Sequence, residues 1–189
     1  MNIKEYKKII KPRMSETRYE HSINVASEAV KLAELYGADK DKAEIAGILH
    51  DVTKETPNEE QLQIMEKNGI ILSKLQLSSP KLWHSLSGAA YINGELGIED
   101  EDILNAVRYH TSGRAGMSTL EKIIFVADFT SAERDYDGIE TIREKSRRSL
   151  EEAMHFGLSF TLVDLVKRGR AIDPNAVECY NDIIINYNF

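Results

Sequence analysis

Six side chains of this sequence belong to the types that bind metal ions in proteins. They are His21, His50, Asp51, His84, His110 and Asp128. His50 and Asp51 are adjacent, so the pair can bind one metal ion while the second carboxylate oxygen of Asp51 reaches another. Four of the five histidines of the chain belong to this set. The distribution indicates a metal site, with hydrolysis as its chemistry.

Helical spacing places these side chains on apolar faces. The four stripes are His21, Val25, Ala29 and Leu32; Ala43, Ala46, Gly47 and His50; Ile103, Val107 and His110; and Leu120, Ile124 and Asp128. One histidine on such a face is usually a hydrogen-bonded core residue, whereas a buried aspartate needs a partner. Since all four stripes carry a histidine or an aspartate, a shared metal centre accounts for them together.

The ligand types restrict the metal. Imidazole and carboxylate groups without thiolates suit iron, manganese, cobalt, nickel or zinc. Three histidines would suffice for one ion, whereas four histidines and two aspartates favour two ions that share Asp51. Two ions a few ångströms apart can activate a water molecule and stabilise the attacked phosphoryl oxygens.

The composition is that of an ordinary soluble domain: 189 residues, 42% hydrophobic and 29% charged, with a mean hydropathy of -0.38. A net charge of -7 argues against a general DNA-binding or RNA-binding surface. No apolar run approaches the ~20 residues that span a bilayer, and the N-terminal segment is too charged for a signal peptide. The single cysteine, Cys179, fits a reducing compartment. We therefore expect a cytoplasmic protein that binds neither nucleic acid nor membrane.

Helix signals recur along the whole chain, and no repeat or linker divides it. Predicted helix starts are Ser15, a capping box at Thr56-Pro57-Asn58-Glu59, Ser79-Pro80, a capping box at Ser118–Glu121, and Asp173-Pro174; predicted ends are Gly37, Gly69 and Gly169, the last after one long stretch from about Ile139. β-type alternation is nearly absent and no heptad persists. We predict an all-α fold, a single compact helical bundle over residues 1–189, with a motif-bearing core over about 15–145 and C-terminal helices over about 139–189.

In the order His21, His50-Asp51, Asp128 the sequence resembles the HD-domain metal phosphohydrolases, whose signature is H…HD…D. It is similar above all to one branch, the bacterial symmetrical bis(5'-nucleosyl)-tetraphosphatases of the YqeK type. The matching segments are Arg18–Ser22, His50–Lys54, His84 with Gly88-Ala89, Arg108–Ser118, and Ala127-Asp128 with Arg134. The segment around His110 is the most specific to the branch.

The resemblance implies an enzyme that cleaves diadenosine tetraphosphate and related dinucleoside polyphosphates symmetrically into two nucleoside diphosphates. One metal ion would be held by His21, His50, Asp51 and Asp128, and the second by His84 and His110, with Asp51 as the bridge. A metal-bound hydroxide would attack an inner phosphorus, because coordination lowers the pKa of water to about 7. The expected cofactor is a pair of divalent or mixed-valence transition-metal ions, iron first, with manganese, cobalt, nickel or zinc as alternatives.

Further side chains near the ligands could contact phosphate. Lys54 follows His50 by one helical turn, and Arg18 precedes His21 by three residues. The alternative to phosphate binding is a solvated side chain for the lysine, a surface salt bridge for each arginine, and a helix cap for Thr111. We predict substrate binding by Arg18, Lys54, Thr111, Arg114 and Arg134, and catalytic roles for Asp51, Lys54, Arg18 and Arg134.

One position departs from the family pattern. After Ala127-Asp128 the family carries an aromatic residue, an aliphatic residue and Glu-Pro, but here the order is Phe129-Thr130-Ser131-Ala132. Ser131 stands where a glutamate is expected, which leaves the role of that glutamate open. Two other functions also stay open: hydrolysis of deoxynucleoside monophosphates or guanosine tetraphosphate, and nucleotide binding by a metal-containing regulator with little turnover. The sequence leaves a homodimer open as well.

Overall fold

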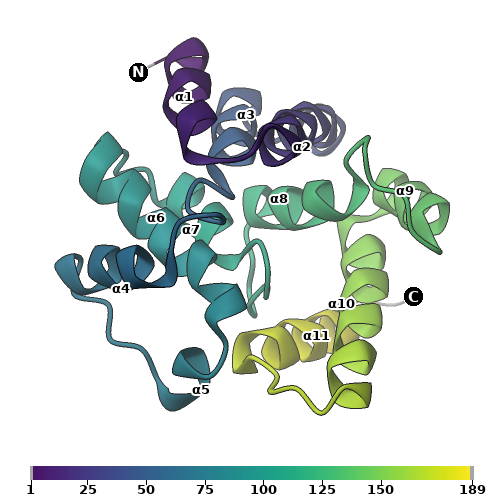
Figure 1. The fold of residues 1–189 in the computed structure, drawn as a ribbon. Helices are drawn as coiled ribbons and strands as arrows, with labels where there is room; N and C mark the ends of the chain where they lie inside the picture. Colours follow the sequence, from purple (N-terminus) through teal and green to yellow (C-terminus); the bar gives the residue numbers. More distant parts are fainter. Residues whose placement is uncertain (1, 188–189) are drawn as a thin grey trace.

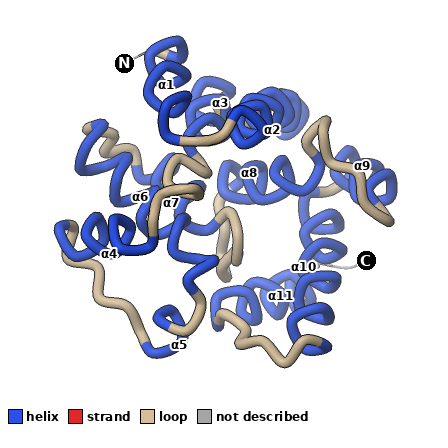
Figure 2. Tube along the Cα trace, viewed as in Figure 1, coloured by secondary structure: helices blue, strands red, loops and turns tan. Residues whose placement is uncertain are grey.

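Helices make up the regular structure of residues 2–187, which the computed structural model describes, and no strand occurs among them (Figure 2). In chain order the α-helices are α1 (Ile3–Ile10), α2 (Glu16–Tyr36), α3 (Lys40–Leu49), α4 (Asn58–Lys67), α5 (Lys74–Leu77), α6 (Trp83–Leu96), α7 (Glu101–Tyr109), α8 (Thr119–Thr130), α9 (Ile139–Arg148), α10 (Leu150–Lys167) and α11 (Pro174–Asn186). Short 3₁₀ turns, Lys11–Arg13 and Pro80–Leu82, precede α2 and α6. The prediction of an all-α fold is confirmed.

Side-chain caps begin several helices where the sequence predicts them. Ser15 accepts a hydrogen bond from the backbone N–H of Arg18 and caps α2. Ser118 and Glu121 form a reciprocal capping box at the start of α8, and Asp173 caps α11. Gly37 ends α2 in the left-handed conformation, with φ 70°. These caps satisfy backbone groups that the helix itself leaves unpaired.

The predicted capping box at Thr56 is wrong. The N-cap of α4 is Pro57, and no side chain caps this helix. The carbonyl of Thr56 instead accepts a hydrogen bond from Gln61 Nε2 at 2.8 Å, with Gln61 buried in the core. A buried side chain from within α4 therefore holds the turn before the helix.

The long helix predicted from Ile139 to Gly169 is interrupted at Ser149. This residue has an extended backbone, with φ -154° and ψ 133°, and separates α9 from α10. Its hydroxyl accepts a hydrogen bond from the backbone N–H of Glu152 and so caps α10. Serine can satisfy backbone donors from its own side chain, which makes a new start competitive with continuation of the helix.

Two neighbouring helices, α2 and α3, approach closely because their facing residues are small. Ala26 and Ala29 of α2 and Ala43, Ala46 and Gly47 of α3 are all buried. A Cβ atom at Gly47 would lie 2.6 Å from Ala26 Cα, far inside contact distance. The contact brings the middle of α2 beside the C-terminal end of α3.

The helices surround α8, which lies near the centre of Figure 1 between the α1–α3 group above it and α10 and α11 below. One hydrophobic cluster extends from Tyr6 in α1 to Ile183 in α11. A smaller cluster of Met65, Trp83 and Leu86 joins α4 to α6. Among the described residues, no helix is both long and apolar enough to cross a membrane.

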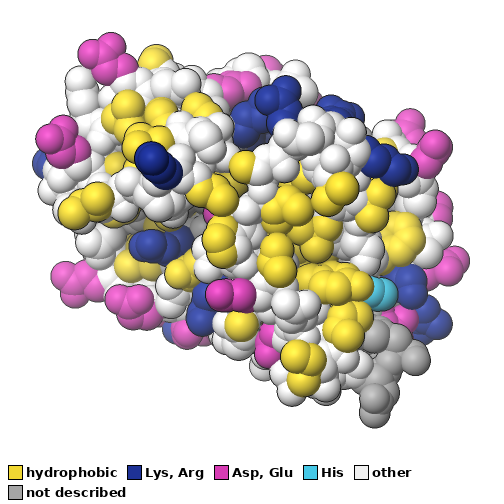
Figure 3. Space-filling view, turned by 90° about the horizontal axis from the view of Figure 1, so that it is seen from below, with side chains coloured by type: hydrophobic (Ala, Val, Ile, Leu, Met, Phe, Trp, Pro, Cys, Tyr) yellow, Lys and Arg dark blue, Asp and Glu magenta, His cyan; other side chains and the backbone are white. Residues whose placement is uncertain are grey.

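Exposed apolar side chains gather on the two C-terminal helices. Phe160, Val163 and Val166 of α10 are exposed, as are Ile184 and Ile185 of α11. Figure 3, which views the molecule from below, shows hydrophobic side chains on the face that these helices form. The homodimer that the sequence leaves open stays a prediction.

Gly47→Ala should lower the free energy of unfolding by about 1–3 kcal/mol, because the new methyl group meets backbone atoms of α2 that cannot rotate away. Gly88→Ala is the matched control, since its new Cβ would find its nearest neighbour at 3.5 Å and alanine favours the helix by about 1 kcal/mol. Denaturant unfolding followed by circular dichroism measures both variants. Wild-type stability of Gly47→Ala would contradict the close packing of α2 and α3.

Candidate metal centre

Three histidines at helix ends donate one ring proton to the backbone. The acceptors of the Nδ1 atoms are Gly47 O for His50 at 2.7 Å, Lys81 O for His84 at 2.9 Å, and Val107 O for His110 at 2.7 Å. Because a carbonyl oxygen can only accept, each Nδ1 carries the proton. In the neutral ring the Nε2 atom then keeps a free lone pair, which is the form that binds metal ions.

The ring of the fourth histidine, His21, is oriented by a carboxylate that the sequence did not predict as part of the site. Its Nδ1 contacts Oε1 of Glu133, and the hydroxyl of Ser131 donates to the same oxygen at 2.7 Å. Burial would raise the pKa of Glu133, but the hydrogen bonds from His21 and Ser131 lower it below its ordinary value. Ser131, at the position where a glutamate is expected, thus supports a glutamate two residues further along. A search of the whole loop after Asp128 for a carboxylate would have found it.

Asp51 lies between two pairs of histidines and faces each pair with a different oxygen. Its Oδ2 is 3.4 Å from Nε2 of His50 and 3.8 Å from Nε2 of His21. Its Oδ1 is 3.3 Å from Nε2 of His84 and 3.6 Å from Nε2 of His110. Oδ1 is buried and has no hydrogen-bond partner among the described residues. This placement suits a carboxylate that bridges two cations.

Asp128 lies on the His21 side of the centre. Its Oδ1 is 3.1 Å from Nε2 of His21, and the guanidinium of Arg134 donates both to this carboxylate and, at 2.8 Å, to the Asp128 carbonyl. The side chains form three groups, and within each group the candidate ligand atoms lie within 4.8 Å of one another. The groups are His21, His50 and Asp51; His50, His110 and Asp128; and Asp51, His84 and His110. The fold therefore brings all six predicted ligands together.

The spacing of the imidazole nitrogens and the protonation state of His84 fit a metal centre. The Nε2 atoms of His21 and His50 are 3.3 Å apart, and those of His84 and His110 are 3.2 Å apart. Unprotonated nitrogens at this distance repel each other unless a cation lies against both lone pairs. Burial, together with the neighbouring His110 and Lys54, lowers the pKa of His84 to about 3, which keeps the ring neutral at pH 7.

The carboxylate of Asp51 is ionised. Burial alone would raise the pKa of Asp51, but the surrounding imidazoles of His50, His110 and His84 lower it well below its ordinary value. Neutral imidazoles and ionised carboxylates are the forms that coordinate metals. With nitrogen and oxygen donors and no thiolate, the cluster fits divalent transition-metal ions.

Four of the five predicted substrate-binding side chains also line this centre. Arg18 donates to Asp51 Oδ2 at 2.9 Å, and Lys54 Nζ is 3.1 Å from His84 Nε2. Burial lowers the pKa of Lys54 below its ordinary value. Thr111 Oγ1 is 3.0 Å from His110 Nε2 and 3.3 Å from His84 Nε2. The fourth of these side chains is Arg134, which reaches the centre by its hydrogen bonds to Asp128.

Arg114 is the exception among these five residues. Its Nε and Nη2 atoms donate to the two carboxylate oxygens of Glu121 at 2.9 and 3.0 Å. Glu121 is fully buried and also accepts from the backbone of Ser118 in the capping box. The described residues show no contact of Arg114 with the metal ligands. Its guanidinium is engaged in holding the loop before α8, which is the salt-bridge alternative left open by the sequence.

Proteins of known sequence match this chain closely. A family model described as HD domain matches residues 18–133. The chain is 40% identical to the symmetrical bis(5'-nucleosyl)-tetraphosphatase of Bacillus subtilis, over 97% of this chain and 98% of that protein. It is 34% identical to the protein of the same name from Staphylococcus aureus, over 96% and 94% of the two chains.

A solved structure agrees with the sequence matches. The crystal structure of a "predicted HD superfamily hydrolase involved in NAD metabolism" from Clostridium acetobutylicum has a TM-score of 0.96 to this fold, covers 99% of both chains and is 33% identical. The HD domain match includes all six metal-ligand candidates. The chain therefore belongs to the HD domain family, in the branch that contains the symmetrical bis(5'-nucleosyl)-tetraphosphatases of B. subtilis and S. aureus.

Proposed function

We propose that this protein is a metal-dependent hydrolase that cleaves diadenosine tetraphosphate and related dinucleoside polyphosphates symmetrically into two nucleoside diphosphates. The observation that carries the proposal is the position of Asp51, with one oxygen facing each histidine pair. Arg18, Lys54 and Arg134 place three cationic groups around it, as phosphoryl transfer requires. The activity named for the B. subtilis and S. aureus relatives supports the substrate class.

The six ligands divide into two sets around Asp51. His21, His50, Asp51 and Asp128 would hold one ion, and Asp51, His84 and His110 the other. Two divalent ions held there would act as Lewis acids toward a water molecule and the attacked phosphoryl group. Iron is our first candidate metal, and the same nitrogen and oxygen ligands also suit manganese, cobalt, nickel or zinc. Elemental analysis of anaerobically purified protein decides among them.

The cationic side chains act on the phosphate chain. Arg18 and Arg134 are each fixed by a carboxylate of the centre, so their remaining N–H groups can donate to phosphate oxygens with little loss of side-chain freedom. Lys54 supplies a third cation from the turn after Asp51, and the Thr111 hydroxyl can donate a hydrogen bond beside His110. These groups orient the phosphates and stabilise the charge that develops in the transition state.

The expected binding partners and cellular location follow from this assignment. The partner is a dinucleoside polyphosphate or its nucleoside diphosphate product, and the net charge of -7 supports the absence of a DNA or RNA partner. A cytoplasmic location agrees with a nucleotide substrate and with the free, buried Cys179. Cell fractionation with an antibody to the chain tests the location.

Metal-loaded protein should convert each diadenosine tetraphosphate into two ADP. Anion-exchange chromatography of the products, with a panel of other nucleotides beside it, measures this. AMP plus ATP would exclude the symmetrical cut. Hydrolysis confined to deoxynucleoside monophosphates or guanosine tetraphosphate would favour another HD phosphohydrolase, and tight nucleotide binding without any product would favour a regulator.

Asp51→Ala should remove both metal ions and all activity, because both ligand sets include this carboxylate. Lys54→Ala should retain the metal and lower kcat by about 10²–10³-fold, as expected for loss of a group that stabilises transition-state charge. Lys67→Ala, which removes an exposed lysine paired with Glu95, is the control for the loss of one positive charge. Retention of two metal ions and full activity by Asp51→Ala would overturn the site assignment.

Glu133→Gln should weaken metal binding by about 10–100-fold, because the carboxylate that orients His21 and increases its basicity is lost. Asp135→Asn removes an equal charge from an exposed position of the same loop and should bind metal like the wild type. Competition with a chromogenic chelator gives the affinities. Equal affinities in the two variants would show that Glu133 acts only through its charge or not at all.

A further inference from the structure

One arginine of α9 binds the backbone of the loop that follows α8. The Nε atom of Arg143 donates to the carbonyl of Thr130 at 3.2 Å. Its Nη2 atom donates to the carbonyls of Ser131 at 2.9 Å and Arg134 at 3.2 Å, and lies 3.5 Å from that of Ala132. Four carbonyl groups of a short loop therefore face a single guanidinium group.

The conformation of this loop depends on the guanidinium. Carbonyl oxygens that point toward one place repel one another unless a donor lies between them, and the planar fork of arginine can donate to several acceptors at once. The Ser131 carbonyl also accepts the backbone N–H of Arg134 at 3.0 Å, so the turn and Arg143 share an acceptor. Ala132 stands where the family carries proline, so no ring fixes the backbone angle φ at that position.

The same loop carries two side chains of the metal centre. Glu133 contacts Nδ1 of His21. Arg134 donates to the carbonyl of Asp128 at 2.8 Å and to its carboxylate. Both side chains start from the stretch of backbone whose carbonyls Arg143 binds. A change in that backbone would move the acceptor of one metal-binding imidazole and the partner of a second metal ligand together.

We propose that Arg143 is a positioning residue of the metal centre, which holds Glu133 against His21 and Arg134 against Asp128 by binding the loop carbonyls. The inference rests on the proposed function for the metal ions, but metal binding is measured without any substrate. Arg143 lies in α9, beyond residues 18–133 that match the HD domain model, and Figure 1 shows this helix beside the end of α8. A helix outside the matched region would thus tune the ligands within it.

The test asks whether Arg143 and Glu133 act on the metal through the same contact. Arg143→Ala should weaken metal binding about 10-fold, within the range for loss of a group that orients a metal ligand. In a Glu133→Gln background the same substitution should cause little further loss, because the contact with His21 is already broken. Competition with a chromogenic chelator gives the affinities of the wild type, both single variants and the double variant.

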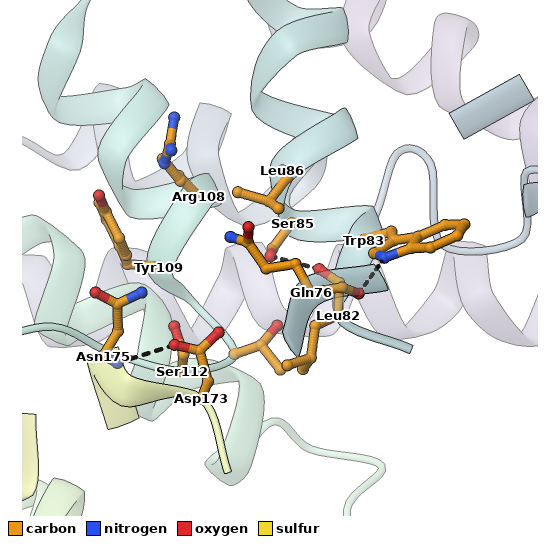
Figure 4. A pocket seen from close by; sticks show the side chains of 11 residues that line it. Gln76, Leu82, Trp83, Ser85, Leu86, Arg108, Tyr109, Ser112, Asp173 and Asn175 are labelled. Carbon is orange, nitrogen blue, oxygen red and sulfur yellow. Dashed lines mark hydrogen bonds between the residues drawn. The ribbon is translucent and has the colours of Figure 1, made fainter. Parts of the chain in front are cut away.

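Three control variants should bind metal as the wild type does. Tyr36→Phe removes another hydrogen bond that anchors α9, from the Tyr36 hydroxyl to the carbonyl of Ser146 at 2.7 Å, without touching the loop. Arg147→Ala removes one positive charge from an exposed position of α9. Asn175→Ala alters a small pocket beside α7 (Figure 4), whose lining residues all lie outside the loop and α9.

Three results would overturn the role of Arg143: wild-type metal affinity in Arg143→Ala, additive losses in the double variant, or an equal loss in Tyr36→Phe. If Arg143→Ala does not fold, Arg143→Lys takes its place in the same comparison, since one ammonium group retains the charge but cannot match the planar fork. The proposed function fails by a different result, namely intact diadenosine tetraphosphate after incubation with the metal-loaded wild type.

Discussion

The metal centre depends on the direction of four imidazole protons. His50 and His110 lie at the C-caps of α3 and α7, where each ring can donate to the carbonyl three residues earlier. His84, at the start of α6, donates to a carbonyl in the preceding 3₁₀ turn. His21 lies inside α2, where the carbonyls already accept helix N–H groups, so its ring needs a side-chain acceptor. The loop after α8 meets this need with Glu133.

Core packing and ligand geometry are linked at Gly47. Its missing side chain lets α2 lie against α3, and this contact sets the 3.3 Å separation between the Nε2 atoms of His21 and His50. Its carbonyl also accepts the Nδ1 proton of His50. A wider helix pair would separate the two ligands, even with every hydrogen bond to the rings retained. The small residues of α3 therefore serve the site as well as the core.

Helical periodicity explains how much of the structure the sequence could predict. Four of the six ligands, His21, His50, His110 and Asp128, lie on apolar stripes, so spacing predicts that they face the core. The caps at Ser15 and Ser118 follow from the sequence as well. Glu133 could not be found this way, because a loop has no period that fixes where its side chains point. The break at Ser149 depends on a local competition between capping and helix continuation. Arg114 depends on a tertiary partner, Glu121, whose burial no sequence pattern indicated.

The charges of the side chains around the centre explain how it can bind an anionic substrate. Three acidic groups, Asp51, Asp128 and Glu133, face three basic groups, Arg18, Lys54 and Arg134. These side chains cancel one another, so the positive charge of two divalent ions would be left for the substrate to neutralise. A chain of four phosphates provides anionic charge of similar size. A protein with a net charge of -7 can therefore attract a polyanion at this one place, because local charge outweighs the total at short range.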